Sequence, residues 1–149
     1  MSLVFVDTPV LLHSEDSADA QRQQCAVGWL TVLWERRCGR LSTQVLNDFY
    51  DHATRRLTPP MPSGDARAEV RRYQRWQPWL IDHATVETAW AIESRFGLAY
   101  ADALVVAAAQ QQGCQWLISP DLPHDLPIDG VHILNPFLIG PDVLDTAKP

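Results

Sequence analysis

The sequence predicts an α/β protein in which a mainly parallel sheet carries helices on both faces. Three short apolar runs, at residues 3–6, 116–119 and 131–134, are the first observation behind this prediction. Runs of this length without polar alternation are typical of strands that are buried on both sides. The second observation is that segments with helical periodicity separate the runs, and such alternation is typical of a parallel sheet.

The first predicted strand, residues 3–6, is followed at once by Asp7 and then by Pro9. Ligands of open α/β sheets bind beyond the carboxyl ends of the strands, so an acid at this point is well placed for chemistry. An ordinary turn before Pro9 explains Asp7 equally well, because Asp is a common turn residue. Both interpretations are open at this stage.

Two amphipathic helices are expected next. Either Asp16 or Ser17 can cap the first helix, and Gly39 is expected to stop it. The second helix begins at Ser42 or Thr43 and ends before a group of three prolines. The inward positions are Ala26, Trp29, Leu30 and Leu33 in the first helix, and Val45, Leu46, Phe49, Ala53 and Leu57 in the second.

A third helix is predicted at residues 65–76, where Arg67, Arg71 and Arg75 form a cationic stripe. The stripe has three interpretations: contacts to RNA phosphates, contacts to the carboxylates of a protein partner, or a solvated helix face. Residues 79–81 predict a small strand or an extended connector. Two further helices are expected at residues 85–96 and 100–112, with Thr85 capping the former. Their inward positions are Val86, Ala89, Trp90 and Phe96, and then Leu104, Val105 and Ala108.

Length and composition favour one domain at residues 1–140, followed by a loose tail at residues 141–149. Three cysteines without paired spacing indicate reduced thiols rather than disulfides or a zinc site. The N-terminus shows no secretory pattern and no apolar run is long enough to cross a bilayer, so we expect a cytoplasmic protein without membrane association. A net charge of −6 argues against a wholesale nucleic-acid coat but permits a local basic groove.

Four acidic residues have positions that suit a shared site at one edge of the sheet. Asp7 and Asp121 each follow a predicted strand. Asp102 lies in the first turn of the 100–112 helix, and Asp48 lies near the start of its own helix. Strand ends and the following helix starts share one edge in such folds. Each acid also has an ordinary explanation: a helix dipole for Asp102, a turn for Asp121 and solvent exposure for Asp48.

If these carboxylates cluster, the site would need a metal ion to balance their charge. Neighbouring negative charges raise one another's pKa, and a hard divalent cation such as Mg²⁺ relieves this conflict with oxygen ligands and retained waters. Such an ion can activate a water for phosphodiester cleavage.

Four segments, in the right order, resemble the PIN-domain nucleases and in particular their VapC toxin branch. Residues 4–11 resemble the opening motif, residues 42–49 the second motif, residues 102–109 with 113–114 the third, and residues 119–122 with 129–137 the end of the domain. The resemblance implies a three-layer α/β/α sandwich. It also implies a Mg²⁺-dependent endoribonuclease, with Mn²⁺ as a substitute, that acts as a toxin, is neutralised by a cognate antitoxin protein and forms a homodimer.

The same resemblance assigns roles to individual residues. The catalytic quartet would be Asp7, Asp48, Asp102 and Asp121. Within it, Asp7, Asp102 and Asp121 would hold the metal, and Asp48 would help to position the metal or its water. Thr8 would be a secondary polar contact.

Two other hypotheses remain. PIN nucleases usually have Asn where Pro9 stands and Glu where Asp48 stands, so the chain is alternatively a PIN-like domain with weakened catalysis that acts by binding protein or RNA. The third hypothesis is another α/β class, such as a phosphoacceptor receiver or a phosphatase. A phosphatase of the Asp-x-Asp type needs an acid at position 9, and a receiver needs a Lys after a late strand, whereas the one Lys is Lys148.

Overall fold

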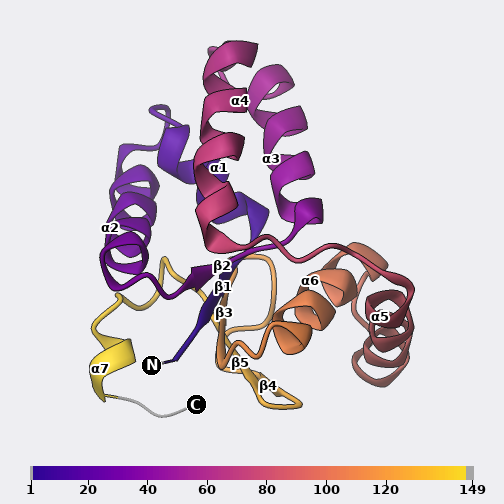
Figure 1. The fold of residues 1–149 in the computed structure, drawn as a ribbon. Coiled ribbons are helices and arrows are strands. Elements are labelled where there is room, and N and C mark those ends of the chain that lie inside the picture. Colours follow the sequence, from indigo (N-terminus) through magenta and orange to yellow (C-terminus); the bar gives the residue numbers. More distant parts are fainter. Residues whose placement is uncertain (1, 147–149) are drawn as a thin grey trace.

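A five-stranded sheet forms the centre of the computed structural model, which describes residues 2–146 (Figure 1). The sheet confirms the predicted strands and adds two strands of two residues each. Four strands run parallel, and the last pair in the order is antiparallel. The order is β2-β1-β3-β5-β4, with β1 at Val4–Val6, β2 at Gly39–Arg40, β3 at Trp116–Ile118, β4 at Pro127–Ile128 and β5 at Val131–Leu134.

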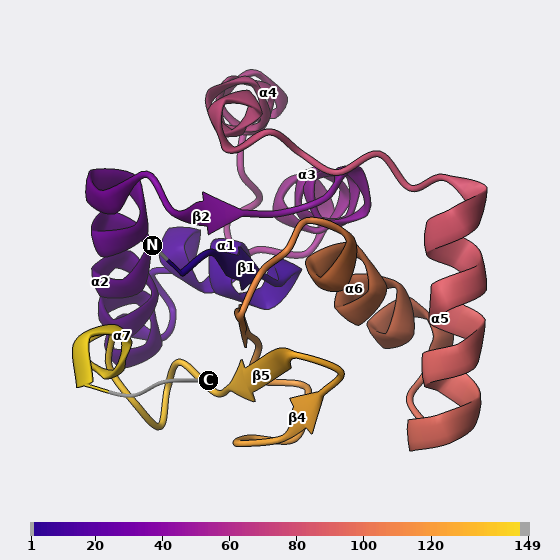
Figure 2. The ribbon, with the colours of Figure 1, turned by 60° about the horizontal axis from the view of Figure 1, so that its bottom comes forward.

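Helices flank this sheet on both sides, as predicted. Figures 1 and 2 show α2 and α7 on one side and α5 and α6 on the other, while α3 and α4 form a pair that projects from the sheet. The helices are α1 (Thr8–Glu15), α2 (Ala20–Arg36), α3 (Thr43–Arg55), α4 (Ser63–Arg72), α5 (His83–Phe96), α6 (Tyr100–Gln111) and α7 (Val143–Thr146), and a 3-10 helix, η1, spans Tyr73–Trp76.

The helix α1 begins directly after β1 and was not predicted. Its apolar residues are consecutive rather than spaced by three or four, with Val10 and Leu11 buried and Leu12 half-buried, so the sequence shows no helical period there. Pro9 lies in the first turn of α1, where no backbone N–H is needed for the helix. Pro9 therefore helps to start a helix.

The ends of α2 differ from the prediction. Asp19, not Asp16 or Ser17, caps the helix by accepting a hydrogen bond from the backbone N–H of Arg22 at 3.1 Å. At the other end Arg37 adopts the left-handed conformation, with φ 56°, so Gly39 is not the stop signal. Gly39 lies in β2 instead, where an added Cβ would stand 2.5 Å from the indole of Trp76.

The predicted helix at residues 65–76 is divided between α4 and the 3-10 helix. This change of winding separates the three arginines of the expected stripe. Arg67 and Arg71 lie on a groove between α3 and α4, whereas Arg75 lies on a different cavity beside Trp76. The stripe is therefore not one continuous surface.

Two details of the region before α6 also differ. Asp82 caps α5 and accepts a hydrogen bond from the backbone N–H of Thr85 at 2.9 Å, so Thr85 is not the cap. Trp90 was expected to face inward, but it is 48% exposed. The segment 79–81 is an extended connector that carries a single bridge between Ser42 and Trp79.

The buried core lies around the sheet, and its large members include Phe5, Trp29, Trp116 and Ile133. The predicted loose tail is partly helical, because α7 occupies Val143–Thr146 and Asp145 pairs with Arg36 through hydrogen bonds of 2.8 and 3.1 Å. Residues 147–149 of that tail lie outside the described part. Within the described residues, none of the helices is both long and apolar enough to cross a membrane.

Candidate active site

Asp7 is a buried acid at the carboxyl end of β1. It caps α1, and its side-chain Oδ1 accepts a hydrogen bond from the backbone N–H of Thr8 at 2.8 Å. Its Oδ2 accepts a hydrogen bond from the hydroxyl of Ser119 at 2.8 Å. Only 5% of Asp7 is exposed, so its carboxylate has little solvation when ionised.

Ser119 connects two of the predicted acids and was not singled out by the sequence. It follows β3, it is fully buried, and its Oγ accepts a hydrogen bond from the backbone N–H of Asp121 at 3.2 Å. Because β1 and β3 are adjacent, Ser119 links Asp7 to the start of the Asp121 loop. The sequence feature that could have identified Ser119 is its hydroxyl directly after an apolar strand.

Asp102 completes a group of three acids that interact electrostatically. Burial raises the pKa of Asp7 to about 6, Ser119 and Thr8 lower it, and the charges of Asp102 and Asp121 raise it. The pKa of Asp102 is also raised, first by burial and then by the charge of Asp121. The structure therefore brings Asp7, Asp102 and Asp121 into one negatively charged region.

Two hydrogen bonds hold the beginnings of the surrounding helices in place. The side-chain Nε2 of Gln44, in the first turn of α3, donates to the carbonyl of Ala101 at 3.0 Å, beside Asp102. The Oγ1 of Thr8 donates to the carbonyl of Val45 at 3.4 Å. The Thr8 hydroxyl therefore contacts α3, and only the backbone N–H of Thr8 contacts Asp7.

Asp48 is exposed and lies on α3, one turn after the start of that helix. Burial raises its pKa, His52 lowers it and Asp51 raises it, so the charges that act on Asp48 within residues 2–146 come from its own helix. Asp48 is three residues beyond Val45, which is roughly 4.5 Å further along the helix from the sheet edge. The charges that link Asp7, Asp102 and Asp121 are not among those that act on Asp48, and the place of Asp48 in the quartet stays a prediction.

The three grouped acids suit a divalent cation in donor chemistry and charge. Asp7, Asp102 and Asp121 supply hard oxygen donors, and their mutual repulsion would be relieved by a positive ion. In the described part of the chain, no set of three His, Cys, Asp or Glu side chains forms a ready metal cage. Mg²⁺ is commonly held by one or two carboxylates with several waters, so it does not require such a cage.

Comparisons with known proteins agree with this fold. The sequence model of the PIN domain family matches residues 4–122. A toxin–antitoxin complex from Klebsiella pneumoniae has 18% identity, covers 91% of this chain and 98% of its own, and has a TM-score of 0.62. The toxin VapC20 of Mycobacterium tuberculosis, described as cleaving the sarcin–ricin loop, has 22% identity, covers 76% and 86%, and has a TM-score of 0.58.

A third solved structure, VapBC2 from Rickettsia felis bound to promoter DNA, has 8% identity, covers 88% of this chain and 96% of its own, and has a TM-score of 0.59. At these identities the likeness concerns the fold. The chain finds no match among curated protein sequences.

Proposed function

This chain belongs to the PIN domain family, and from that premise we propose that it is a metal-dependent endoribonuclease that acts as the toxin of a toxin–antitoxin pair. The observation that carries the proposal is the buried carboxylate of Asp7, whose pKa is raised to about 6 beside Asp102 and Asp121. Perturbed acids at the carboxyl edge of an α/β sheet are typical of functional sites. Two of the similar structures contain toxins, and one of these cleaves RNA in the sarcin–ricin loop, which supports the choice of substrate.

The residues of the site would divide the work as follows. Asp7, Asp102 and Asp121 would hold Mg²⁺ or Mn²⁺, which when bound supplies positive charge and activates a water for phosphodiester hydrolysis. Ser119 fixes the orientation of Asp7 through its hydroxyl. The carboxyl of Asp7 carries its charge above a pKa of about 6, so it is ionised at neutral pH. Asp48 keeps its role in the quartet only as a prediction.

Partners follow from the same proposal. An antitoxin protein would neutralise the toxin, and the active form would be a homodimer. An enzyme that cuts cellular RNA acts where that RNA is, so the proposal implies a cytoplasmic protein. Light scattering of the purified chain tests the dimer, and a monomer at all concentrations would contradict it.

The proposal is tested by Asp7→Asn in the full chain, with Asp142→Asn as the control at an exposed acid. Wild-type protein and the control should cleave labelled RNA when Mn²⁺ is present, and Asp7→Asn should not. Mn²⁺ at 100 times its Kd should also stabilise wild-type protein by about 2.7 kcal/mol in thermal melting, and Asp7→Asn much less. Unchanged cleavage by Asp7→Asn would refute the assignment.

A second candidate function is a PIN domain with weakened catalysis that acts by binding protein or RNA. Pro9 and Asp48 favour it, because PIN nucleases usually have Asn and Glu at these two positions. Calorimetric titration with Mn²⁺ separates the two candidates. Tight binding together with RNA cleavage supports the nuclease, whereas RNA binding without measurable Mn²⁺ binding supports the second candidate.

A further inference from the structure

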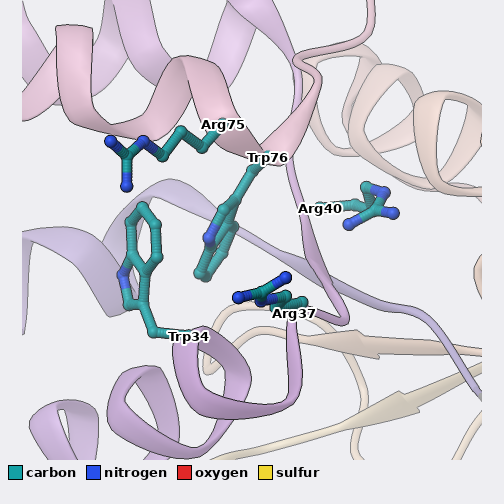
Figure 3. Close-up of a pocket in the computed structure, with 5 residues that line it drawn as sticks. All are labelled: Trp34, Arg37, Arg40, Arg75 and Trp76. Atoms are coloured by element: carbon teal, nitrogen blue, oxygen red, sulfur yellow. The ribbon is translucent and has the colours of Figure 1, made fainter.

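A cavity of about 510 Å³ lies where the end of α2, the edge strand β2 and the 3-10 helix meet (Figure 3). Its lining residues are Trp34, Arg37, Arg40, Arg75 and Trp76. Arg37 precedes β2, whereas Asp7 follows the parallel strand β1, so the two sites lie at opposite ends of the strands. The cavity is therefore separate from the candidate active site.

Every side chain that lines this cavity can donate hydrogen bonds but has no atom that accepts them. Arginine and tryptophan side chains offer only N–H groups. Within residues 2–146, Arg37, Arg40 and Arg75 form no ion pair, and the hydrogen bond of the Arg40 side chain goes to the backbone carbonyl of Gly39 at 2.8 Å. Three unpaired cations in one place stand out in a chain whose net charge is −6.

The two tryptophans give a second, independent observation. The indole N–H of Trp76 is buried and finds no acceptor among the described residues, whereas the indole N–H of Trp34 acts on the hydroxyl of Tyr73 and lowers its pKa. Trp76 is only 3% exposed. Buried donors without a partner are unusual in folded proteins, and this one lies among the packed rings of Trp34 and Tyr73. The cavity thus offers a ligand the N–H donors of its three arginines, and the two tryptophan rings form its aromatic wall.

The aromatic side of the cavity is held rigidly. The rings of Trp34 and Trp76 have centroids 5.1 Å apart, and Tyr73 packs edge-on against Trp76 at 4.8 Å. The close approach of Trp76 to Gly39 fixes the 3-10 helix against β2. A preformed site of this kind loses little entropy when a ligand binds.

The arrangement of the guanidinium groups indicates the kind of ligand. Figure 3 shows Arg75 beside Trp34 on one side of Trp76, Arg40 on the other side, and Arg37 below Trp76. The charges are spread along the cavity and do not converge on one point. A single anion would leave some of them unpaired, whereas successive phosphates of a nucleic-acid backbone would meet them in turn. Guanidinium groups also match phosphate oxygens in pairs.

We infer that this cavity binds backbone phosphates of the RNA substrate, away from the bond that is cut. The inference rests on the proposed function, since that function supplies RNA as the ligand. Contacts to phosphates carry no sequence information, so the cavity would add affinity equally to RNAs of unrelated sequence. Cleavage specificity would come from elsewhere in the protein.

The test measures binding of fluorescent single-stranded RNA by anisotropy, without divalent ions, in full-length Asp7→Asn protein so that RNA remains intact. The variant Arg37→Gln/Arg75→Gln should bind about tenfold more weakly, and the slope of log affinity against log salt should fall by about 1.4, for two lost contacts. The control Arg95→Gln removes a charge already paired with Asp129 at 2.6 Å and should bind like its parent. Arg37→Lys/Arg75→Lys keeps both charges and should restore most of the affinity, which separates lost phosphate contacts from lost folding.

Unchanged RNA affinity and salt slope in Arg37→Gln/Arg75→Gln would overturn the inference. Tryptophan fluorescence that changes with polyglutamate but not with RNA would overturn it in favour of an acidic protein segment. A fluorescence change with inorganic phosphate, but with RNA affinity independent of the two arginines, would also overturn it. Because binding is measured without cleavage, loss of binding in the variant supports the inference even where wild-type protein fails to cut RNA.

Discussion

Replacing Asp7 by Asn should make the protein more stable at neutral pH, although it removes a proposed catalytic group. Burial raises the pKa of Asp7 from 3.8 to about 6, so the folded state binds the proton more tightly than the unfolded state does. Stability from this group is therefore complete below pH 3.8 and is lost as the pH rises to about 6. At about 1.36 kcal/mol per pH unit, the full loss is roughly 3 kcal/mol.

The amide of Asn can still accept the hydrogen bond from the backbone N–H of Thr8, and the pKa of about 6 already includes the opposing effect of the hydrogen bonds from Ser119 and Thr8. We therefore expect Asp7→Asn to be more stable than wild-type protein by about 3 kcal/mol at pH 7.5. Urea unfolding between pH 4.5 and 8 measures this difference, which should shrink toward the acid end. The exposed control Asp142→Asn should show no such trend. A lower stability of Asp7→Asn at pH 7.5, or a difference that ignores pH, would refute the reasoning.

Three other variants test separate parts of the structure. Gly39→Ala should lower the free energy of unfolding by about 1–3 kcal/mol in urea, because its Cβ would stand 2.5 Å from a buried indole, whereas Gly28→Ala, which meets no atom within 4 Å, should not. Ser119→Ala removes a hydrogen bond that lowers the pKa of Asp7, so the acid limb of the cleavage rate should move to higher pH; an unmoved limb would contradict the assigned bond. Asp48→Asn should reduce cleavage by less than roughly tenfold, and a loss as large as that of Asp7→Asn would show that this carboxylate belongs to the site.

Much of the fold could be predicted because, in a long helix, the spacing of the apolar residues indicates which face is buried. Residue spacing predicts the helices α2, α3, α5 and α6, and short apolar runs predict the three strands β1, β3 and β5. The strands β2 and β4 have two residues each, which is too short for any pattern. The helix α1 was not predicted because its apolar residues are consecutive and show no helical period. Trp90 was misplaced because a large apolar side chain does not reveal whether a neighbour covers it.

The candidate site was predictable to the extent that strand ends determine positions. Asp7 and Asp121 follow strands, and Asp102 begins a helix, so all three were expected at one edge. The contribution of Ser119 depends on which strands are neighbours, and spacing along the chain does not supply that information. The separation of Arg75 from Arg67 depends on a local change from α-helix to 3-10 helix, which the regular spacing concealed.

The two outermost strands, β2 and β4, determine how this protein can meet another chain. Each offers only two residues of backbone, and β4 begins with Pro127, which has no N–H to donate. Strand addition needs a longer row of free donors and acceptors, so both borders discourage it and with it fibre-like growth. We therefore expect a partner protein to contact the helices and loops rather than to extend the sheet.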